Sequence, residues 1–519
     1  MKNQNLYALI DSRMPRDPSA VCLETADGLV YSYRDLQFGS ARIAGWLASL
    51  GLAADADGAP PRIAVQVEKS PEAVMLYLAA LRAGFAYVPL NTAYQAAEIE
   101  YFLNDVRPGV FVCTPQRLAQ QAGCARVMTL GEARDGSLLQ AAAPFADRFG
   151  TVKRAASDLA AILYTSGTTG RSKGAMLSHG NLSSNALVLD EFWGFREERE
   201  AGGHDVLLHA LPIFHVHGLF VALHAALLAG GSMIFHAKFD PRQVIAALPR
   251  ATVFMGVPTF YTRLLAEHEL DRHACRHMRL FISGSAPLLA ETFEAFRRRS
   301  GHTILERYGM SETVMLVSNP YFGTARERLA GTVGMPLPGV GVRVVRDDGR
   351  ACNTGEIGKV EVRGPNVFSG YWRMPEKTAE EFTADGWFRT GDVGCFGGER
   401  RPDSYLTLVG RSKDLIISGG YNVYPKEIEG YIDALPGVVE SAVIGLPHPD
   451  FGEAVAAVVV GVRDAAPAAG AIVEKLRGQI ANFKVPKRVW VVDELPRNAM
   501  GKVQKNLLRE RYAATFSAS

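Results

Sequence analysis

Short apolar runs alternate with helix-like segments along the first half of this chain. A stretch with helical periodicity, Pro71–Ala83, separates the first two of these runs. The strand-like runs are Arg62–Val67, Ala86–Pro89, Val110–Cys113, Asp205–Ala210 and Thr252–Gly256. Parallel strands need long crossover connections, which are usually helices, so this alternation is typical of parallel sheets. It predicts an α/β fold in which a large domain of stacked, mostly parallel sheets is flanked by helices.

The composition changes near residue 330 and again near residue 410. The stretch Gly331–Arg363 is rich in Gly, Val and Pro and contains short alternating runs, which predicts an antiparallel β subdomain over about residues 331–410. The short charged stretch Gly410–Asp414 precedes a tail with mixed strand and helix patterns. We therefore predict a large domain over residues 1–410 and a small, mobile α+β domain over residues 411–519, joined by a hinge.

Charge and hydropathy argue against nucleic-acid or membrane partners. The 56 basic and 54 acidic residues leave a net charge of +2, which provides no electrostatic footprint for nucleic acid or an anionic membrane. The longest apolar run, Gly218–Phe235, contains His224 and is broken by Gly230, Gly231 and Ser232. We predict that it forms a buried helix, a turn and a strand rather than a membrane span.

The six cysteines lie far apart and none forms a CxxC pair. Neither a zinc site nor a disulfide framework is therefore indicated, and isolated thiols fit a reducing compartment. The N-terminal segment MKNQNLYALIDSRMPRD lacks the apolar core of a signal peptide. We expect a cytoplasmic location.

The segment Tyr164–Gly174, YTSGTTGRSKG, follows the apolar run Leu159–Leu163. Its glycines allow backbone N–H groups to turn toward an anion, while threonine and serine hydroxyls and Lys173 add donors and a positive charge. This combination predicts a cradle for a polyphosphate. It is not a Walker A loop, because Ser172 rather than glycine precedes Lys173. The alternative, a flexible surface linker, explains neither the preceding strand nor the lysine.

Five motifs occur in the order found in the acyl-adenylate-forming (AMP-binding) superfamily, which includes acyl-CoA synthetases, luciferases and carrier-protein adenylation domains. They are YTSGTTGRSKG, YGMSET at Tyr308–Thr313, TGD at Thr390–Asp392, GRSKDLIISGGYNVYP at Gly410–Pro425 and PRNAMGKVQK at Pro496–Lys505. The chain thus resembles this superfamily, and segments such as GVPTFYTRLL and RLFISGSAPLL resemble bacterial malonyl-CoA synthetases. The resemblance implies that the chain uses ATP to activate a small carboxylic acid as an acyl-adenylate and passes the acyl group to coenzyme A.

The resemblance also implies which residues bind the nucleotide. Tyr308 would stack on adenine, and the Asp392 carboxylate would accept hydrogen bonds from the ribose hydroxyls. Glu312 and Thr165 would hold Mg²⁺, an ion that prefers hard oxygen ligands. The full expected ATP and AMP set is Thr165, Ser166, Gly167, Thr168, Thr169, Gly170, Lys173, Ser285, Ala286, Glu306, Arg307, Tyr308, Gly309, Met310, Ser311, Asp392 and Arg411.

Lys502 resembles the lysine that reaches the carboxylate and the α-phosphate during adenylation. It is far in sequence from the phosphate cradle, so the small domain would have to close over the large one. The pivot would correspond to Lys413, and the turn formed by Ser418, Gly419 and Gly420 would line the channel for coenzyme A. Neutralisation of Lys502 by acylation would remove the charge needed for adenylation, which makes Lys502 a candidate for regulation.

The choice of acid is expected to depend on Arg263, in the apolar and aromatic segment PTFYTRLL. Burying an arginine there is costly unless it is paired, and a second substrate carboxylate would pair with it. The alternatives are an arginine that reaches the surface or one paired with an internal acid. Ser283 and His217 would complete the acyl pocket, and His217 joins Lys502, Glu312 and Thr165 in the expected catalytic set.

His215 and His217 are two residues apart and would share one face of a strand, which is a spacing that a metal pair can use. No third ligand is evident, so we expect His215 to be a hydrogen-bonded core histidine rather than a metal ligand.

The leading hypothesis is a malonate–CoA ligase that also accepts methylmalonate and releases AMP and pyrophosphate. The same chemistry with another short mono- or dicarboxylic acid is the first alternative. Transfer to a carrier-protein thiol and a nucleotide-binding protein without catalysis are two others; the presence of both Glu312 and Lys502 argues against the last.

Overall fold

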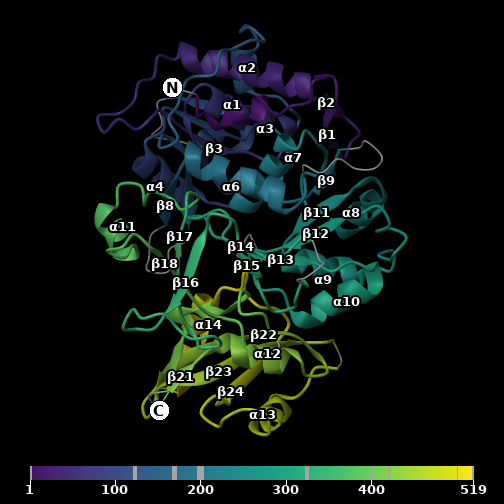
Figure 1. Ribbon diagram of the computed structural model, residues 1–519, viewed down its shortest axis with the longest axis vertical. Helices are drawn as coiled ribbons and strands as arrows, with labels where there is room; N and C mark the ends of the chain where they lie inside the picture. The colour runs from purple at the N-terminus through teal and green to yellow at the C-terminus, as the bar shows by residue number, and fades with distance from the viewer. Residues whose placement is uncertain are drawn as a thin grey trace.

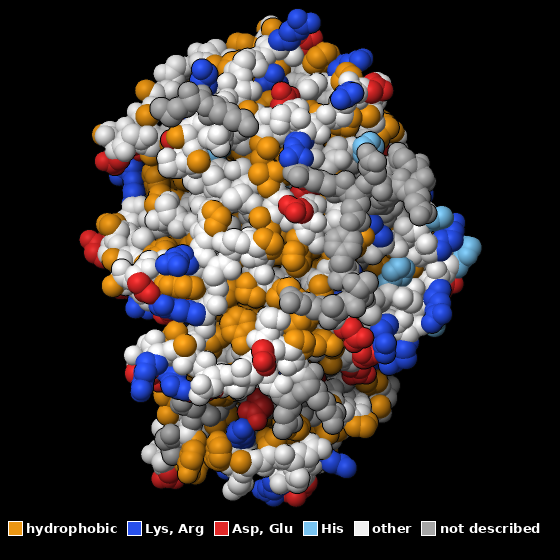
Figure 2. Space-filling model, viewed as in Figure 1, with side chains coloured by type: hydrophobic (Ala, Val, Ile, Leu, Met, Phe, Trp, Pro, Cys, Tyr) orange, Lys and Arg blue, Asp and Glu red, His pale blue; other side chains and the backbone are white. Residues whose placement is uncertain are grey.

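The computed structural model describes residues 3–120, 126–165, 172–195, 204–321, 327–398, 401–418, 421–463, 465–498 and 501–516. Within these ranges the chain forms a large N-terminal part that contains three sheets and a small C-terminal part that contains one (Figure 1). Figure 2 shows acidic and basic side chains interspersed among apolar ones on one face, in keeping with the nearly balanced charge.

The largest sheet has a parallel centre, and its strands from β13 to β1 pair in parallel. Central strands such as β11 and β12 are buried along their whole length, as expected for a parallel sheet covered on both faces. In order across the sheet, the described strands are β15 (Met335–Pro336), β14 (Val317–Ser318), β13 (Leu305–Tyr308), β12 (Leu280–Ser283), β11 (Val253–Gly256), β9 (Val206–His209), β10 (Ser232–Phe235), β1 (Val21–Thr25) and β2 (Val30–Ser32).

The second sheet is also parallel, except that β7 and β8 form an antiparallel pair. In order across it, the described strands are β6 (Val127–Thr129), β5 (Val110–Cys113), β3 (Arg62–Gln66), β4 (Ala86–Pro89), β7 (Leu159–Thr165) and β8 (Lys173–Ser178). The bounds of β4 and β5 coincide with the sequence prediction. The α/β prediction is therefore confirmed.

Helices cover these sheets, and one of them is itself part of the core. α3 (Pro71–Arg82) is capped by the Ser70 side chain, and every residue from Pro71 to Leu81 is buried, as expected for a helix enclosed on all sides. Further α-helices of this part are α1 (Leu6–Asp11), α2 (Tyr33–Ser49), α4 (Ala96–Val106), α5 (Ser137–Ala142), α6 (His179–Phe192), α8 (Pro241–Ala247), α9 (Pro258–Ala266) and α10 (Ala290–Ser300).

The apolar run Gly218–Phe235 forms helix, turn and strand, as predicted, but the helix begins with an unexpected geometry. Its first part, η2 (His217–Leu223), is a π-helix that continues into α7 (His224–Leu228) before β10. Such wide turns are rare and frequently occur at functional sites. Among the described residues, no helix is long and apolar enough to span a membrane.

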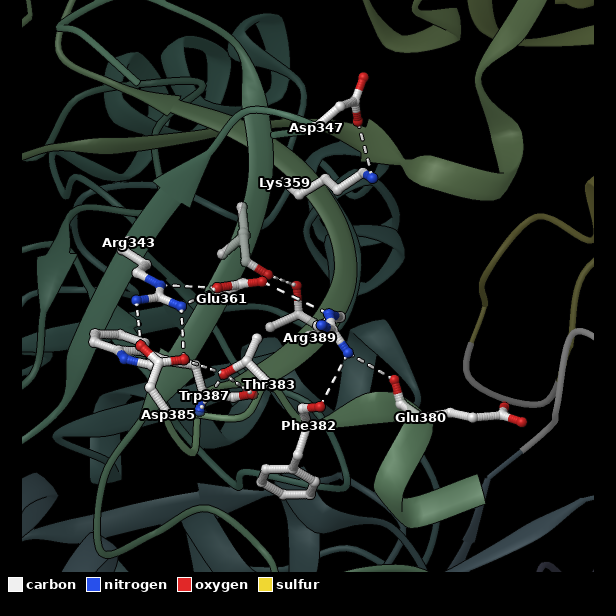
Figure 3. Close-up of polar contacts among 12 residues, drawn as sticks. Arg343, Asp347, Lys359, Glu361, Glu380, Phe382, Thr383, Asp385, Trp387 and Arg389 are labelled. Carbon is white, nitrogen blue, oxygen red and sulfur yellow. Dashed lines mark hydrogen bonds and ion pairs between the residues drawn. The ribbon is translucent and has the colours of Figure 1, made fainter. Parts of the chain in front are cut away.

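The predicted antiparallel β region is present as a four-stranded sheet in the described residues, made of β16 (Gly341–Val345), β17 (Gly358–Arg363), β18 (Phe388–Phe396) and β19 (Leu406–Arg411). Figure 3 shows Arg343 of β16 joined to Glu361 of β17 and to Asp385. Each of these two ion pairs has a distance of 2.8 Å between nitrogen and oxygen. Arg389 of β18 donates to the carbonyl oxygens of Glu380 and Phe382. These contacts fix α11 (Pro375–Glu381) against the sheet.

The small C-terminal part, here called the lid, lies below the large part in Figure 1. Its described strands are β21 (Tyr421–Val423), β20 (Ile416–Ser418), β23 (Gly452–Gly461), β22 (Val438–His448) and β24 (Arg488–Val492), and its α-helices are α12 (Pro425–Asp433), α13 (Ala469–Arg477) and α14 (Lys505–Tyr512). One hydrophobic cluster includes Val443 and Ile472, and a second includes Ile444 and Leu508. The lid is therefore an α+β unit with hydrophobic cores of its own.

Candidate active site

Several parallel strands of the large part end at polar residues that the sequence associates with one site. β7 ends at Thr165, β12 at Ser283 and β13 at Tyr308. Ligands of open α/β sheets bind outside the carboxyl ends of their strands. The fold thus places these residues where a ligand site is expected.

One cluster of the site, here called the nucleotide side after the residue set that the sequence predicts, contains a buried, fully partnered carboxylate, Asp392. The Tyr308 hydroxyl donates to one carboxylate oxygen of Asp392, and Arg411 Nε lies 2.7 Å from the other. Asp392 and Arg411 are cross-strand partners on β18 and β19. Burial, reinforced by the neighbouring Asp392, raises the pKa of Tyr308 well above its usual value, so this hydroxyl keeps its proton and remains a donor. The structure thus brings together three residues of the predicted nucleotide set.

Glu312 lies beside this group and is 6% exposed. Its Oε1 accepts a hydrogen bond of 3.0 Å from the Tyr371 hydroxyl, and burial raises the pKa of its carboxyl group. A cation bound there would favour the charged form. No group of three or more His, Cys, Asp or Glu side chains suited to a metal was found in the described ranges. Glu312 with the Thr165 hydroxyl offers hard oxygen ligands, a set that fits Mg²⁺, which usually takes few ligands from protein.

Residues of α4 form hydrogen bonds near both ends of the segment Tyr164–Gly174, the predicted phosphate loop. The Tyr164 hydroxyl donates to Asp105 at 2.5 Å, and the Tyr101 hydroxyl donates to the Ser172 carbonyl at 2.8 Å. Thr165 and Lys173 are paired across β7 and β8, so the loop leaves from and returns to one hairpin. The predicted phosphate ligands between these strands, Ser166, Gly167, Thr168, Thr169 and Gly170, lie outside the described residues.

Lys173 contacts the β subdomain at α11. Its Nζ lies 3.4 Å from Glu381 and 4.2 Å from the centre of the Tyr371 ring. Since the Tyr371 hydroxyl also donates to Glu312, Tyr371 connects Lys173 to the residue that is expected to bind the metal. The sequence reasoning missed Tyr371, Glu381 and Asp105; a signal for Tyr371 was available in the segment GPNVFSGYWRMPEKT.

The remaining predicted nucleotide residues lie on β13 and on the turns after β12 and β13. The buried Glu306 accepts a hydrogen bond from the Leu288 backbone and thereby braces the turn that contains Ser285 and Ala286; burial raises its pKa to about 7. Gly309 has no room for a side chain, because a Cβ there would lie 2.0 Å from the Val314 carbonyl oxygen. Met310 and Ser311 follow it and are partly buried.

A second buried polar cluster contains His217, Ser283 and Arg307; it is here called the acyl side, because the sequence predicts His217 and Ser283 to line the acyl pocket. His217 is the first residue of η2 and is 0% exposed. The Arg307 guanidinium packs on the backbone of Gly284, because a Cβ at that glycine would lie 2.5 Å from Arg307 Cζ. Both ring nitrogens of His217, Oγ of Ser283, and Nε and Nη2 of Arg307 are buried without a hydrogen-bond partner in the described part of the chain. Burying a polar atom without a hydrogen bond costs free energy, so each of these atoms needs an explanation.

The protonation states of this group follow from burial and proximity. Burial lowers the pKa of Arg307 to about 9. Burial and the nearby Arg307 charge hold the pKa of His217 well below its usual value, so the imidazole is neutral at physiological pH. A neutral imidazole and a serine hydroxyl can each donate to a carboxylate, and an arginine supplies the opposite charge.

Lys502 lies on a lid loop that closes over the large part. On this loop a Cβ at Gly501 would lie 3.1 Å from the Thr259 hydroxyl of α9. Burial of its ammonium group lowers the pKa of Lys502 to about 8. On the nucleotide side, Arg411 lowers this pKa further and Asp392 raises it, and Arg307 on the acyl side also lowers it. The side chain nevertheless keeps substantial exposed surface. Its charge therefore lies between the two sides of the site.

Arg263 differs from the sequence expectation. On α9, Tyr261 and Leu264 face the core, whereas Arg263 is exposed and makes no hydrogen bond or ion pair with the described residues. The expectation of a buried arginine was wrong, because helical periodicity turns this position outward. Thr259 is four residues earlier on the same face and lies next to Gly501, so Arg263 is on the face of α9 that meets the lid loop.

The expectation of a strand at His215 and His217 was also wrong. His215 lies in a bend before the π-helix, and burial together with the Lys502 charge lowers its pKa to about 3. Of the predicted hinge and channel residues, Lys413 lies in η4 (Ser412–Asp414), between the last strand of the β subdomain and the first strand of the lid. Ser418 ends β20, and Gly419 and Gly420 lie outside the described residues.

The chain matches the AMP-binding enzyme family over residues 10–372 and the AMP-binding enzyme C-terminal domain over residues 427–502. It is similar to the mitochondrial malonate–CoA ligase of Mus musculus, with 36% identity over 482 residues, 85% of this chain and 80% of the relative. It is also similar to ATP-bound MatB from Rhodopseudomonas palustris, with 52% identity, coverage of 99% and 100%, and a TM-score of 0.93. The apo structure of MatB gives 53% identity, the same coverage and a TM-score of 0.82. The arrangement of this chain is therefore closer to the ATP-bound form.

Proposed function

The chain belongs to the AMP-binding enzyme family, and on that premise we propose that it is an ATP-dependent acid–CoA ligase that converts malonate, ATP and coenzyme A to malonyl-CoA, AMP and pyrophosphate. The similarity to malonate–CoA ligases supports this choice of acid. Methylmalonate is proposed as a second substrate.

The observation that carries the proposal is the set of unpartnered polar atoms on His217, Ser283 and Arg307. A malonate molecule has one carboxylate to activate and a second carboxylate that must be held. The second carboxylate would accept hydrogen bonds from these buried donors and would pair with the Arg307 charge. Arg307, which the sequence associated with the nucleotide, is thus reassigned by this proposal to the acid.

In the first half-reaction a malonate carboxylate oxygen attacks the α-phosphorus of ATP, and pyrophosphate leaves. Two anions must approach each other, so positive charge at the point of attack is required. Lys502 supplies that charge between the acid and the nucleotide, and Asp392 and Tyr308 orient the nucleoside. Glu312 and Thr165 are the residues that would hold Mg²⁺, an ion that neutralises phosphate charge when bound.

In the second half-reaction the coenzyme A thiol attacks the acyl carbon of the malonyl-adenylate and AMP leaves. Lys502 occupies the space near that carbon, so the lid has to move before the thiol can approach. We place the pivot at Lys413 and assign one side of the thiol channel to the turn after Ser418. The corresponding division is a large domain over residues 1–410 and a lid domain over residues 411–519.

The direct test is the formation of AMP and a CoA thioester from a panel of acids, with the products identified by mass. Malonate is expected to give malonyl-CoA, with acetate, propionate and succinate at least about 100-fold lower in kcat/KM. Absence of malonate-dependent AMP, or a preference for a monocarboxylate, would overturn the proposal and favour the same chemistry on another acid.

Arg263 is proposed as an additional charge at the mouth of the acyl pocket, supported by its position on the face of α9 near the lid loop. Arg263→Ala should raise the KM for malonate by roughly 10-fold and leave that of ATP unchanged. Arg272→Ala, another exposed arginine of the large part, serves as the matched control. Equal effects of the two changes would remove Arg263 from the site.

Two further properties are proposed. Lys502 is a site of inactivating acylation, because its lowered pKa increases the neutral, nucleophilic amine and acylation would remove the charge. An acetylated preparation with full adenylation activity would contradict this. A cytoplasmic location is proposed from the dispersed cysteines, of which Cys22, Cys113 and Cys275 are buried free thiols. Recovery of the protein in an organelle fraction would exclude it.

A further inference from the structure

Lys69 is a buried lysine that joins the two sheets of the large part. It follows β3 of the six-stranded sheet and is 9% exposed. Its Nζ lies 2.7 Å from the carbonyl oxygens of His209 and His236, which end and follow neighbouring parallel strands of the other sheet, and 2.8 Å from Nδ1 of His209. No ion pair joins Lys69 to a carboxylate of the described residues. A buried cation without an anion is costly, so its retention needs a reason other than stability.

The contacts of Lys69 determine which ring nitrogen of His209 carries the proton. An ammonium group has three donors and no acceptor, and the three groups around Nζ are two carbonyl oxygens and Nδ1. The Gly218 carbonyl oxygen beside Nε2 can only accept, so the proton of the neutral ring lies on Nε2 and Nδ1 accepts from Nζ. Nε2 is 3.0 Å from the carbonyl oxygen of Gly218 and donates to it. Burial and the Lys69 charge both lower the pKa of His209, in agreement with a neutral ring.

The hydrogen bond from His209 ends at the first turn of the π-helix. Gly218 is the second residue of η2 and follows His217 directly. A Cβ at Gly218 would lie 2.1 Å from the Pro212 carbonyl oxygen, so the backbone is packed tightly on its other side. The position of His217 is thus fixed by a close backbone contact and by the hydrogen bond from His209.

We propose that Lys69 and His209 are positioning residues for the acyl pocket: through the Gly218 carbonyl they hold the first turn of η2 so that His217 meets the second carboxylate of the acid. This proposal rests on the proposed function and concerns residues that contact neither the acid nor the nucleotide. A purely structural role would affect acid and nucleotide binding alike, whereas a positioning role affects the acid alone.

The test compares variants of the full-length enzyme by the KM for malonate, the KM for ATP and the melting temperature. Lys69→Met and His209→Leu are expected to raise the KM for malonate at least about 10-fold, with the KM for ATP within about 2-fold. His209→Gln retains both an acceptor for Nζ and a donor for the Gly218 carbonyl, and should remain within about 3-fold of the parent.

The matched control is Tyr77→Phe. Tyr77 contacts His224 Nε2 at 2.8 Å, so this change removes another buried contact to a histidine of the same helical run, at the start of α7 rather than in the first turn of η2. Its KM for malonate should stay within about 2-fold of the parent. A rise equal to that of Lys69→Met, or equal rises for malonate and ATP in Lys69→Met, would overturn the positioning role.

If Lys69→Met and His209→Leu fail to fold, the test compares His209→Asn with His209→Gln. The shorter asparagine amide cannot reach the Gly218 carbonyl, whereas the glutamine amide can. A selective rise in the malonate KM for His209→Asn supports the proposal, and equal values for the two variants overturn it. An unmodified enzyme that uses another acid and not malonate contradicts the proposed function; the same variants are then compared with that acid.

Discussion

The nucleotide side and the acyl side of the site differ in how their buried polar groups are partnered within the chain. On the nucleotide side, Asp392 accepts from Tyr308 and pairs with Arg411. On the acyl side, His217 and Arg307 carry buried nitrogen atoms without partners among the described residues. A pocket with unpartnered donors rejects a ligand that cannot satisfy them, because desolvation of those donors is then uncompensated. Selectivity is therefore expected from the acyl side, and general affinity for ATP from the other.

Lys502→Ala should have the largest effect, because Lys502 contributes charge to both sides at once. Malonate-dependent pyrophosphate release should fall by about 1,000-fold, while transfer from preformed malonyl-adenylate to coenzyme A should be retained. Lys487→Ala, an exposed lysine elsewhere on the lid, is the control. Equal loss of both half-reactions would contradict the assigned role.

Arg307→Met tests the comparison directly. It preserves much of the buried volume and removes the charge, so kcat/KM for malonate should fall by about 100-fold with little change in the KM for ATP. The two parameters are obtained by varying each substrate at saturation of the other. A rise in the KM for ATP as large as the effect on malonate would assign Arg307 to the nucleotide side. The proposed difference between the nucleotide side and the acyl side would then be lost.

The pH dependence of adenylation is expected to come from Lys502. Its pKa of about 8 means that the ammonium is present below pH 8 and is lost above it, so kcat/KM should fall by about 10-fold per pH unit on the alkaline side. Bound phosphate favours the charged form, so the corresponding fall in kcat should occur at higher pH. In Lys502→Arg the guanidinium stays charged, and this alkaline limb should disappear; its persistence would point to another group.

Tyr308→Phe should have the smallest effect. It removes one donor to Asp392, while Arg411 and the Thr390 hydroxyl, which accepts from the Asp392 backbone N–H, still orient that residue. A rise of roughly 5-fold in the KM for ATP is expected, with the KM for malonate unchanged. A change in the malonate KM would show that the two sides are coupled through β13.

The fold was largely predictable because short apolar runs and helical periodicity were clear. Ala86–Pro89 and Val110–Cys113 coincide with β4 and β5, and the described residues contain an antiparallel β sheet. The π-helix was not predictable, because His217–Leu223 is apolar on all sides and such a run has no period from which hydrogen-bond spacing can be inferred.

The proposed reassignment of Arg307 and the error at Arg263 have physical reasons of a similar kind. Arg307 and Tyr308 are neighbours on β13, and successive side chains on a strand point to opposite faces, so the two side chains do not share one face of the strand. That alternation was a signal available in the sequence. Arg263 was misjudged because an arginine among apolar residues was assumed to be buried with them, although Tyr261 and Leu264 already define the inner face of α9. The network of Lys69 and His209 joins positions 140 residues apart, which no local pattern discloses.

The lid sheet has a hydrophobic cluster on each of its faces, with Val443 in one and Ile444 in the other. A unit with its own cores loses its structure in its own cooperative transition. Melting of this protein should therefore proceed in two calorimetric steps. ATP is expected to contact residues of both parts, so its binding to the folded protein should reduce the difference between the two melting temperatures. Exchange of the lid for that of a relative would then alter catalysis without endangering the folding of the larger part.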